Sequence, residues 1–246
     1  MDQENKQHSV ILEAEKQEFL AVLSHELRSP LTAVKGYLSM VLDGDEGKIG
    51  PEIRKSISAA FVANERSIKL IESMIKVVQI QEEQLKFTFQ KVDLVQTIQI
   101  LVHDFEVPAK EKNIQIIYQL PPMPVLVTAD PDRTREVLSN ILSNAVKFTR
   151  KGTVTIDHRS IPESEGMLEV VDIADTGVGI AKENQSRIFN IFTKENLSLA
   201  NQEKGTGLGL FTASKIAEAQ GGRVWLEKSE PGLGSTFSVA FKEYNG

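Results

Sequence analysis

Cysteine is absent from this sequence of 246 residues, and features that mark several other protein classes are missing too. Without cysteine there can be no disulfide, no thiol catalysis and no thiolate-bound metal. No apolar run approaches the roughly 18 residues that span a bilayer, and residues 1–16 lack the pattern of a signal peptide. A net charge of −6 argues against general binding of nucleic acid, which requires a basic face. We therefore expect a cytoplasmic globular protein that reaches a membrane only through an upstream segment of a longer chain.

Several familiar nucleotide and metal motifs are also missing. The sequence has no GxxxxGKS/T phosphate loop, and DTGVGIAK and GTGLGLF lack the third glycine of the dinucleotide fingerprint. It has neither HRD nor DFG, which are signatures of the Ser/Thr/Tyr protein kinases. Residues 43–50 begin like a calcium loop, but Arg54 stands where that loop requires glutamate. These absences exclude four common classes of nucleotide- or calcium-binding protein.

Two long helices are predicted for the first third of the chain. Residues 1–42 have no proline before Pro30, and their apolar residues recur at spacings of three, four and seven, which indicates an amphipathic helix. We expect a kink at Pro30, which has no backbone N–H to donate. Residues 43–50 predict a loop, and Pro51 suits the first turn of a second helix. The apolar stripe of that helix is Ile53, Ile57, Phe61, Ile68, Ile71, Ile75 and Val78, with Asn64 as its polar interruption.

The two helices and their short loop predict an antiparallel hairpin. One hairpin with a narrow apolar stripe on each helix cannot bury both stripes well by itself. The economical arrangement is a homodimer, in which two hairpins form a four-helix bundle. The alternative is a hairpin that packs on another domain of its own chain, and we favour the homodimer.

From residue 84 onward the pattern changes to short strands and helices. Residues 87–93 predict a strand that ends at Asp93, which is a good helix N-cap. Strands and helices mix without strict βαβ alternation, which indicates an α+β sandwich: a mixed sheet with helices on one face. The other predicted elements are helices 94–112, 131–148 and 207–219, and strands 114–119, 125–129, 153–159, 167–174, 223–228 and 235–241.

His25 is the residue of the first helix that could carry chemistry. It lies between Leu23 and Leu27 of the apolar stripe, and at about 100° per residue it points well away from their shared face. It therefore faces solvent or a docking partner, with Glu26 beside it. Simple solvation is the usual state of a surface histidine, and it is our interpretation of His8, His103 and His158.

The segment REVLSNILSNAVKFT, residues 135–149, places polar side chains on one face of a predicted helix. Asn140, Asn144 and either Lys147 or Phe148 fall at helical spacing. An amide oxygen is a hard ligand that suits Mg²⁺ carried in by a nucleotide, because Mg²⁺ keeps most of its water and phosphate ligands. A lysine one turn further along can neutralise phosphate. Taken alone, an ordinary helix with its polar residues outward explains the segment equally well.

Three more segments are typical of a nucleotide pocket. In DTGVGI, Asp175 can accept a hydrogen bond from an exocyclic amine, which would select adenine. Gly177 and Gly179 let the backbone approach a ring or a phosphate. IFNIF, residues 188–192, has two phenylalanines that pack in the core or pin a mobile segment against it. KGTGLGLF, residues 204–211, has alternating glycines that open a helix, where backbone amides can meet phosphate.

The segments HELRSPL, NILSNAVKFT, DTGVGI, FNIF and GTGLGL, in this order, resemble the sensor histidine kinases of two-component signalling. The resemblance covers residues 10–242, and five segments in the family's order make it specific. It implies a dimerisation and phosphoacceptor hairpin followed by an ATP-binding domain of the Bergerat type, the type found in DNA gyrase. It also implies ATP and Mg²⁺ as cofactors, and the receiver domain of a response regulator as a partner in trans.

The resemblance further implies a division of the chain into four parts. These are a signalling helix that enters the core, a dimerisation and histidine phosphotransfer domain, a linker, and a catalytic ATP-binding domain. We place them at residues 1–20, 21–83, 84–90 and 91–246. The expected fold is thus multidomain, with a dimeric helical bundle followed by an α+β sandwich.

Individual residues receive roles from the same resemblance. His25 would be the phosphoacceptor and Glu26 its acid/base partner. The nucleotide would be bound by Asn140, Asn144, Lys147, Phe148, Asp175, Gly177, Gly179, Lys194, Gly205, Thr206, Gly207, Leu208 and Gly209, with Asn144 as the Mg²⁺ ligand. Residues 193–204 would form a mobile lid. We also predict that Ser29, one turn beyond His25 on the same face, orients a water that dephosphorylates the partner.

The sequence departs from the family's common pattern at four positions. Ser29 stands where threonine or asparagine is usual, which bears on the strength of phosphatase activity. Lys194 stands where an arginine often reaches phosphate, and lysine lacks the bidentate fork of arginine. Gln220 replaces a common histidine, and Phe211 replaces a small residue. None of these changes removes a core function.

Two other functions compete with this interpretation. One is a Bergerat-fold ATPase or serine kinase without a phosphohistidine, against which the HELRSP segment argues. The other is a scaffold, or a phosphatase that merely binds ATP, against which intact His25, Glu26, Asn144 and Asp175 argue. We therefore expect ATP-dependent autophosphorylation of His25, followed by transfer to an aspartate of a receiver domain.

Overall fold

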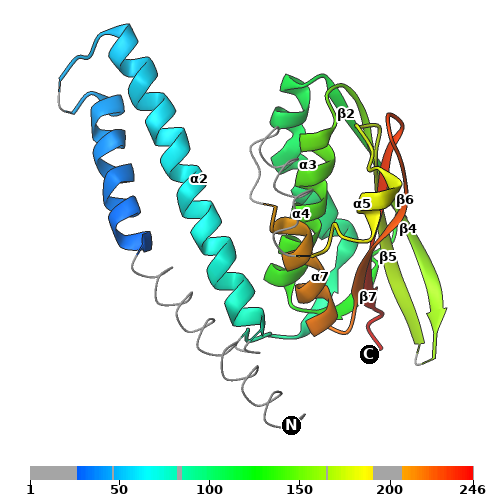
Figure 1. The fold of residues 1–246 in the computed structure, drawn as a ribbon. Coiled ribbons are helices and arrows are strands. Elements are labelled where there is room, and N and C mark those ends of the chain that lie inside the picture. Colours follow the sequence, from blue (N-terminus) through cyan, green and yellow to red (C-terminus); the bar gives the residue numbers. More distant parts are fainter. Residues whose placement is uncertain (1–26, 46, 82–84, 165, 191–206, 246) are drawn as a thin grey trace, which may run out of the picture. The chain divides into compact units, whose positions relative to one another are not determined.

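The structure is a computed structural model that describes residues 27–45, 47–81, 85–164, 166–190 and 207–245. Its elements are shown in Figure 1. The chain divides into two compact units, Met1–Leu85 and Lys86–Gly246. Within the described residues, no helix combines the length and the apolar character needed to cross a membrane.

The first unit contains the two predicted helices. Residues 27–43 are helical, and α2 comprises Pro51–Gln81. Asn64 of α2 is buried and donates from Nδ2 to the backbone carbonyl of Leu31 at 2.9 Å. Lys35, one turn after Leu31, has its ammonium 5.8 Å from the centre of the ring of Phe61. Because later residues of the first helix meet earlier residues of α2, the two helices run antiparallel, and the predicted hairpin is confirmed.

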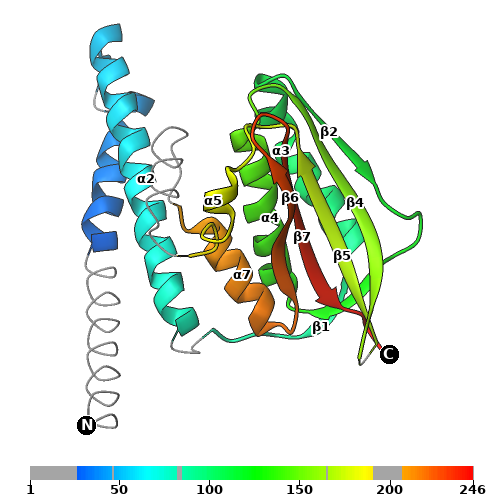
Figure 2. The ribbon, with the colours of Figure 1, turned by 45° about the vertical axis from the view of Figure 1, so that its right-hand side comes forward.

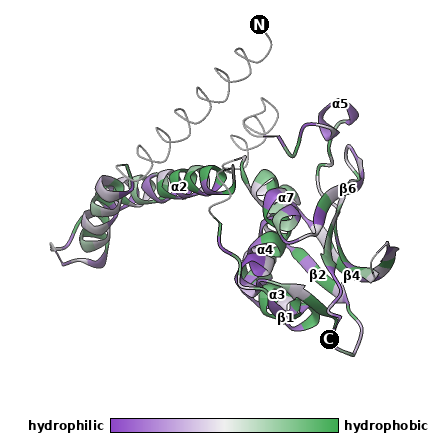
Figure 3. Cartoon of the chain, turned by 90° about the horizontal axis from the view of Figure 1, so that it is seen from below, coloured by the Kyte–Doolittle hydropathy of each residue, from purple (hydrophilic) through white to green (hydrophobic). Residues whose placement is uncertain are grey.

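Apolar side chains of this hairpin remain exposed in the single chain. Val34 of the first helix is 44% exposed, and Ile53 of α2 is 56% exposed, although Ile53 belongs to the predicted apolar stripe. Figure 3 shows apolar and polar residues interleaved along α2. A group of exposed apolar residues on one unit is typical of an interaction surface. The predicted kink at Pro30 stays a prediction, because the residues before Leu27 lie outside the described part of the chain.

The second unit is built on a five-stranded sheet with the strand order β2-β4-β5-β7-β6. β2 and β4 are parallel, and the other neighbours are antiparallel. A separate two-stranded sheet pairs β1 with β3 in antiparallel fashion. The strands are β1 (Gln90–Asp93), β2 (Ile114–Gln119), β3 (Leu126–Ala129), β4 (Gly152–Glu163), β5 (Gly166–Asp175), β6 (Arg223–Glu230) and β7 (Gly234–Lys242).

Three helices cover one face of the five-stranded sheet, as Figures 1 and 2 show. They are α3 (Leu94–Glu111), α4 (Pro131–Phe148) and α7 (Gly209–Ala219). Burial of their apolar faces against the sheet forms the core, in line with the expected α+β sandwich. The largest fully buried side chains include Leu94, Leu138, Ile141, Leu142, Ile156, Ile173, Leu208, Ile216 and Phe241.

The structure refines the predicted elements in two places. The strand expected at residues 87–93 is shorter, because only Gln90–Asp93 find partners on β3. Asp93 does cap α3, since its side chain accepts from the N–H of Val95 at 2.9 Å. A short helix, α5 (Lys182–Gln185), lies in a stretch where the sequence predicted neither a helix nor a strand.

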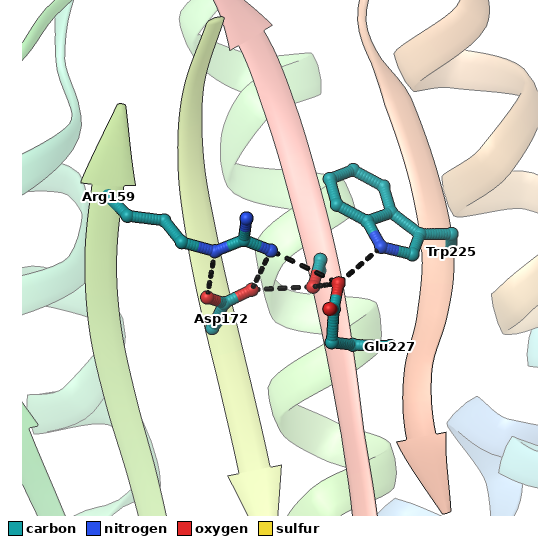
Figure 4. Close-up of polar contacts among 5 residues, drawn as sticks. Arg159, Asp172, Trp225 and Glu227 are labelled. Carbon is teal, nitrogen blue, oxygen red and sulfur yellow. Dashed lines mark hydrogen bonds and ion pairs between the residues drawn. The ribbon is translucent and has the colours of Figure 1, made fainter. Parts of the chain in front are cut away.

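The face of the sheet away from the helices carries a polar network (Figure 4). Arg159 on β4 donates to Asp172 on β5 at 2.7 Å and to Glu227 on β6 at 3.1 Å. Trp225 donates from its indole nitrogen to Glu227 at 2.6 Å and shields the buried side chains of Leu168, Val170 and Ala240. β5 is therefore buried on both faces, which explains why its sequence, LEVVDIA, is an almost continuous apolar run.

Candidate functional site

α4 carries the first group of predicted site residues. Asp130 caps the helix by accepting from the N–H of Arg133 at 3.1 Å, and Pro131 occupies the first turn. A buried apolar stripe fixes the helix on the sheet. Asn140 and Asn144 are only partly buried. Since they lie four residues apart, their amides share one face at the edge of the core.

Asp175 ends β5 and is only 9% exposed. Its Oδ1 accepts from the backbone N–H of Gly177 at 2.7 Å, and the backbone of Ser235 on β7 forms a second hydrogen bond. Burial raises the pKa of Asp175, and these two hydrogen bonds oppose that shift. An ionised carboxylate accepts at up to about four lone-pair positions, so this side chain retains capacity to accept from a further donor.

The loop that follows Asp175 lies against the end of α4. The backbone N–H of Val178 donates to the carbonyl oxygen of Phe148 at 3.3 Å. A Cβ atom on Gly177 would lie 2.5 Å from the same oxygen, and this distance is shorter than real Cβ contacts. Glycine is therefore needed for this close approach. The structure thus brings together the DTGVGI segment and the last turn of the predicted amide-bearing helix.

Two lysines lie at the last turn of α4: Lys147 belongs to it, and Lys112 reaches it from the end of α3. Lys112, just after α3, donates from Nζ to the carbonyls of Lys147 at 2.8 Å and Val146 at 3.2 Å. A cation at the C-terminus of a helix is favoured by the helix dipole. The ammonium of Lys147 lies 4.4 Å from the centre of the Phe148 ring. Because the carbonyl of Phe148 accepts from Val178, Lys147 and Phe148 lie beside the loop that carries Gly177.

The start of α7 meets α4 from the other side. Gly207 has φ +73°, a conformation that glycine adopts readily, and Leu208 is fully buried and anchors the turn. A Cβ atom on Gly209 would lie 3.4 Å from Oδ1 of Asn140. The glycines that open α7 and the first amide of α4 are therefore neighbours.

The phenylalanine segment begins after α5. Phe189 lies edge-on to Phe237 of β7, with 6.3 Å between the ring centres, and Ile188 is buried. Packing against the sheet is therefore part of what this segment does. Phe192 and the lid predicted at residues 193–204 lie outside the described residues.

Several predicted site residues are not placed with this group. His25, Glu26, Lys194, Gly205 and Thr206 lie outside the described residues. Ser29 is described and is exposed on the helix of residues 27–43, which belongs to the other unit. The site as described therefore consists of α4, the end of β5 with its loop, and the start of α7.

This arrangement is suited to binding a nucleotide. It offers a buried carboxylate for a base, a partly buried lysine beside an aromatic ring, and glycines that open a helix, where phosphates are stabilised. Among the described residues, no three His, Asp or Glu side chains are grouped closely enough to hold a metal by themselves. A partly buried amide such as Asn144 fits an ion whose other ligands are phosphates and water.

Two family models match the chain. The model for the histidine kinase-, DNA gyrase B-, and HSP90-like ATPase matches residues 129–245. The model for the His Kinase A (phospho-acceptor) domain matches residues 15–83. The chain belongs to the histidine kinases of two-component signalling. It has the order of domains that defines their catalytic core, a helical phosphoacceptor region followed by an ATP-binding domain.

Curated relatives agree with this assignment. The chain is 30% identical over 238 residues to the sensor histidine kinase WalK of Bacillus subtilis, covering 94% of this chain and 38% of the relative. It is 35% identical over 233 residues to the circadian input-output histidine kinase CikA of Synechococcus elongatus, covering 94% of this chain and 30% of the relative. The histidine kinase chain described here therefore spans about a third of these relatives.

Solved structures show the same fold. Full-length ShkA, crystallised in complex with AMPPNP, matches with a TM-score of 0.77 and 29% identity, over 93% of this chain and 47% of that chain. The catalytic domain of the histidine kinase ThkA matches with a TM-score of 0.55 and 26% identity, over 64% of this chain and 97% of that chain.

Sequence reasoning missed the residues whose side chains bond to the backbone of the elements that carry this kinase's candidate site. Lys112 bonds to α4 from 34 and 35 residues away in sequence, and Gln185 bonds to Ser229 from 44 residues away. Nothing local marks such contacts, because a lysine after a helix or a glutamine in a polar stretch is usually solvated.

Proposed function

We propose that this histidine kinase core transfers the γ-phosphoryl group of ATP to His25, and then to an aspartate of a response-regulator receiver domain. The observation that carries the proposal is the junction of Phe148, Gly177 and Asp175. It joins the amide-bearing helix to a buried carboxylate that can select adenine. The matched family models are those of an ATPase and a phosphoacceptor domain.

The chemistry of the first step follows from imidazole. A histidine with a reference pKa near 6.5 is largely neutral at cytoplasmic pH and has a lone pair to offer. One ring nitrogen of His25 attacks the γ-phosphorus in line, the bond from phosphorus to the β–γ bridging oxygen breaks, and ADP leaves. Glu26 holds the proton on the other ring nitrogen and stabilises the positive charge that develops. Positioning and electrostatics supply most of the rate.

The nucleotide would be held by the residues that the second unit brings together. Asp175 accepts from the exocyclic amine of adenine, and the ring of Phe148 lies beside the base. Lys147 and the glycines that open α7 stabilise the phosphates. Mg²⁺ would be held by the phosphates and the amide of Asn144, and it would neutralise phosphate charge. Lys194, Gly205 and Thr206 would complete the site on the far side of the phosphates.

The arrangement of domains is part of the same proposal. Residues 21–83 form the dimerisation and phosphotransfer domain, and residues 91–246 form the catalytic domain. Residues 1–20 carry the signal, and residues 84–90 are the linker whose motion lets the two domains meet. The exposed Val34 and Ile53 become buried when two hairpins form a four-helix bundle in the homodimer.

The direct test is the chemical nature of the phosphorylated product. Incubation of the full chain with γ-labelled ATP should give a labelled protein whose phosphate is lost in acid and retained in base, as expected for a phosphohistidine. Scintillation counting after treatment at each pH measures it. An acid-stable product would favour the alternative, a Bergerat-fold serine kinase, and ATP hydrolysis without any label would favour an ATPase.

Ser29 gives a second prediction, on the reverse activity. Replacing Ser29 with alanine should lower the rate at which the chain dephosphorylates a phosphorylated receiver domain by roughly tenfold, since a water-orienting hydrogen bond contributes about 1 kcal/mol or somewhat more. Autophosphorylation should change less than about twofold, because the proposed mechanism gives Ser29 no part in the transfer from ATP to His25. Release of phosphate from a labelled receiver domain, and label on the kinase, measure the two rates.

Ser39→Ala is the matched control for Ser29→Ala. Its hydroxyl lies on the same helix but bonds to the exposed Asp43 at 3.1 Å, and Ser39 itself is partly buried. This variant should leave both rates unchanged. Phosphatase activity that survives in Ser29→Ala, at the level of the Ser39→Ala control, would rule out the role of Ser29.

A further inference from the structure

Ile180, the last residue of the DTGVGI loop, is held at both of its backbone groups. Its N–H donates to Oγ of Ser229 on β6 at 2.8 Å, and its carbonyl accepts from Nε2 of Gln185 on α5 at 3.0 Å. Nε2 of Gln185 also donates to the backbone carbonyl of Ser229 at 3.1 Å. Both hydrogens of one amide group are therefore used, and they join α5, the loop and β6.

The loop also lies directly on the turn between β6 and β7. The N–H of Gly232 donates to the carbonyl of Val178 at 2.8 Å. A Cβ atom on Gly179 would collide with the carbonyl oxygen of Glu230. Contact between two backbones at this distance leaves the loop no room to move toward the turn. The hydrogen bonds of Gln185 and Ser229 prevent it from moving away.

The same contacts continue to Asp175, the carboxylate proposed to bind adenine. Oγ of Ser229 lies 2.9 Å from Oγ of Ser235, and the backbone of Ser235 is hydrogen-bonded to Asp175. A Cβ atom on Gly234 would collide with the carbonyl oxygen of Asp175. A continuous set of contacts thus runs from the amide of Gln185 through two serines to Asp175.

We propose that Gln185 and Ser229 are positioning residues for base selection: they hold the loop so that the carboxylate of Asp175 is aimed at the exocyclic amine of adenine. This inference rests on the proposed function, since it concerns the same nucleotide site. Neither side chain needs to touch the nucleotide. A loop already held in its binding conformation loses little entropy on binding, and therefore selects its ligand more sharply.

The test compares two nucleotides that differ at the selected group. Inosine triphosphate has a carbonyl oxygen where ATP has the exocyclic amine, so it gains nothing from a well-placed Asp175. Gln185→Met keeps the length of the side chain and removes both donors. By calorimetry on the full chain, its affinity for ATP should fall about tenfold, as expected for two lost hydrogen bonds. Its affinity for inosine triphosphate should change less than about twofold, so the preference for ATP shrinks about tenfold.

Substitutions at Ser229 keep the inference testable if Gln185→Met folds poorly. Ser229→Ala removes the hydroxyl that holds the N–H of Ile180 and should lose base selectivity in the same way. Ser229→Thr retains the hydroxyl and should retain most of the selectivity. Ser186→Ala, at an exposed position beside Gln185, is the matched control and should behave as the unmodified chain does.

Three results would overturn the inference. Equal losses of affinity for both nucleotides would mean that Gln185 and Ser229 only stabilise the fold, because general loosening does not distinguish an amine from a carbonyl. Unchanged affinities in Gln185→Met and Ser229→Ala would mean that the contacts do not matter for binding. An unmodified chain that binds neither nucleotide would overturn the proposed function itself, and this inference with it.

Discussion

Chains that carry His25→Gln should incorporate no label from γ-labelled ATP above background, while they still bind ATP. Glutamine has a similar length and can donate hydrogen bonds, but it has no nucleophilic lone pair comparable to that of imidazole. Autoradiography of the chain after denaturing gels measures the loss, and calorimetry measures the retained nucleotide affinity. Label that persists in His25→Gln would show that another residue is the acceptor.

His103→Gln is the control for this substitution. His103 lies on α3 with its side chain 83% exposed, beside Glu106 at 3.7 Å, and the sequence assigned it no role. We expect normal labelling of this variant. A loss of label in both variants would point to a general effect of removing histidine, and would contradict the assignment of His25.

Mixing two inactive variants tests the proposed homodimer. His25→Gln chains keep the nucleotide site and lack the acceptor, whereas Asn144→Ala chains keep the acceptor and lack the proposed Mg²⁺ ligand. Each alone should be unlabelled. Label on the Asn144→Ala chains in the mixture would show that they form dimers and that the phosphoryl group passes between chains. No label, with mixed dimers demonstrated by two different affinity tags, would show transfer within one chain.

Asp175→Asn should weaken ATP binding roughly 10- to 100-fold while the fold is kept. The carboxylate is the proposed acceptor for the exocyclic amine of adenine. In the asparagine variant, the Nδ2 amide group at this position is a donor, and it cannot accept a hydrogen bond from the amine. Removing a hydrogen bond to a charged group in a buried site costs about 1.5–3 kcal/mol, which corresponds to roughly 10- to 100-fold in affinity. Calorimetric titration with ATP measures the change.

The same substitution should not destabilise the chain at neutral pH. Burial raises the pKa of Asp175 above its ordinary value, so the ionised form is disfavoured in the folded state. A group with a raised folded pKa contributes stability below its unfolded pKa, and loses that contribution as pH rises through the folded pKa. Asparagine is neutral at every pH. We therefore expect Tm of Asp175→Asn at pH 7 to equal or exceed that of the unmodified chain.

Asp172→Asn is the matched control on the same strand. Asp172 faces the opposite side of the sheet, where it accepts from Arg159 in the network of Figure 4. Its loss should lower Tm slightly and leave ATP affinity unchanged. The two variants should thus show opposite patterns: one keeps stability and loses binding, and the other loses some stability and keeps binding. Equal loss of ATP affinity in both would contradict the role of Asp175.

Local sequence patterns predicted most of the elements of the second unit to within a few residues. Helices 94–112 and 131–148 correspond to α3 and α4, because the cap at Asp93 and an apolar period of three to four residues are local signals. The pairing of strands was not predictable in the same way. That β5 lies between β4 and β7, and that β1 and β3 form a separate sheet, depends on contacts between distant residues.

For the candidate site too, some features were predictable from the sequence and others were not. The identities of Asn144, Asp175 and the glycines follow from residue types at fixed spacings, because nucleotide chemistry restricts which side chains and which backbone conformations can serve. Their proximity does not follow from spacing. The contact of Gly177 with the carbonyl of Phe148 joins residues 29 apart in sequence, and it exists only because the end of β5 meets the end of α4.

The sequence by itself determined the family, the order of the two domains and the chemical groups of the candidate site, since each is written in residue types and short spacings. Only the tertiary structure decided how those groups are held. The amide of Gln185, the hydroxyl of Ser229 and the ammonium of Lys112 all act on backbone groups at least 34 residues away or on a neighbouring loop. Such contacts depend on how the sheet orders its strands, and no local pattern encodes that order.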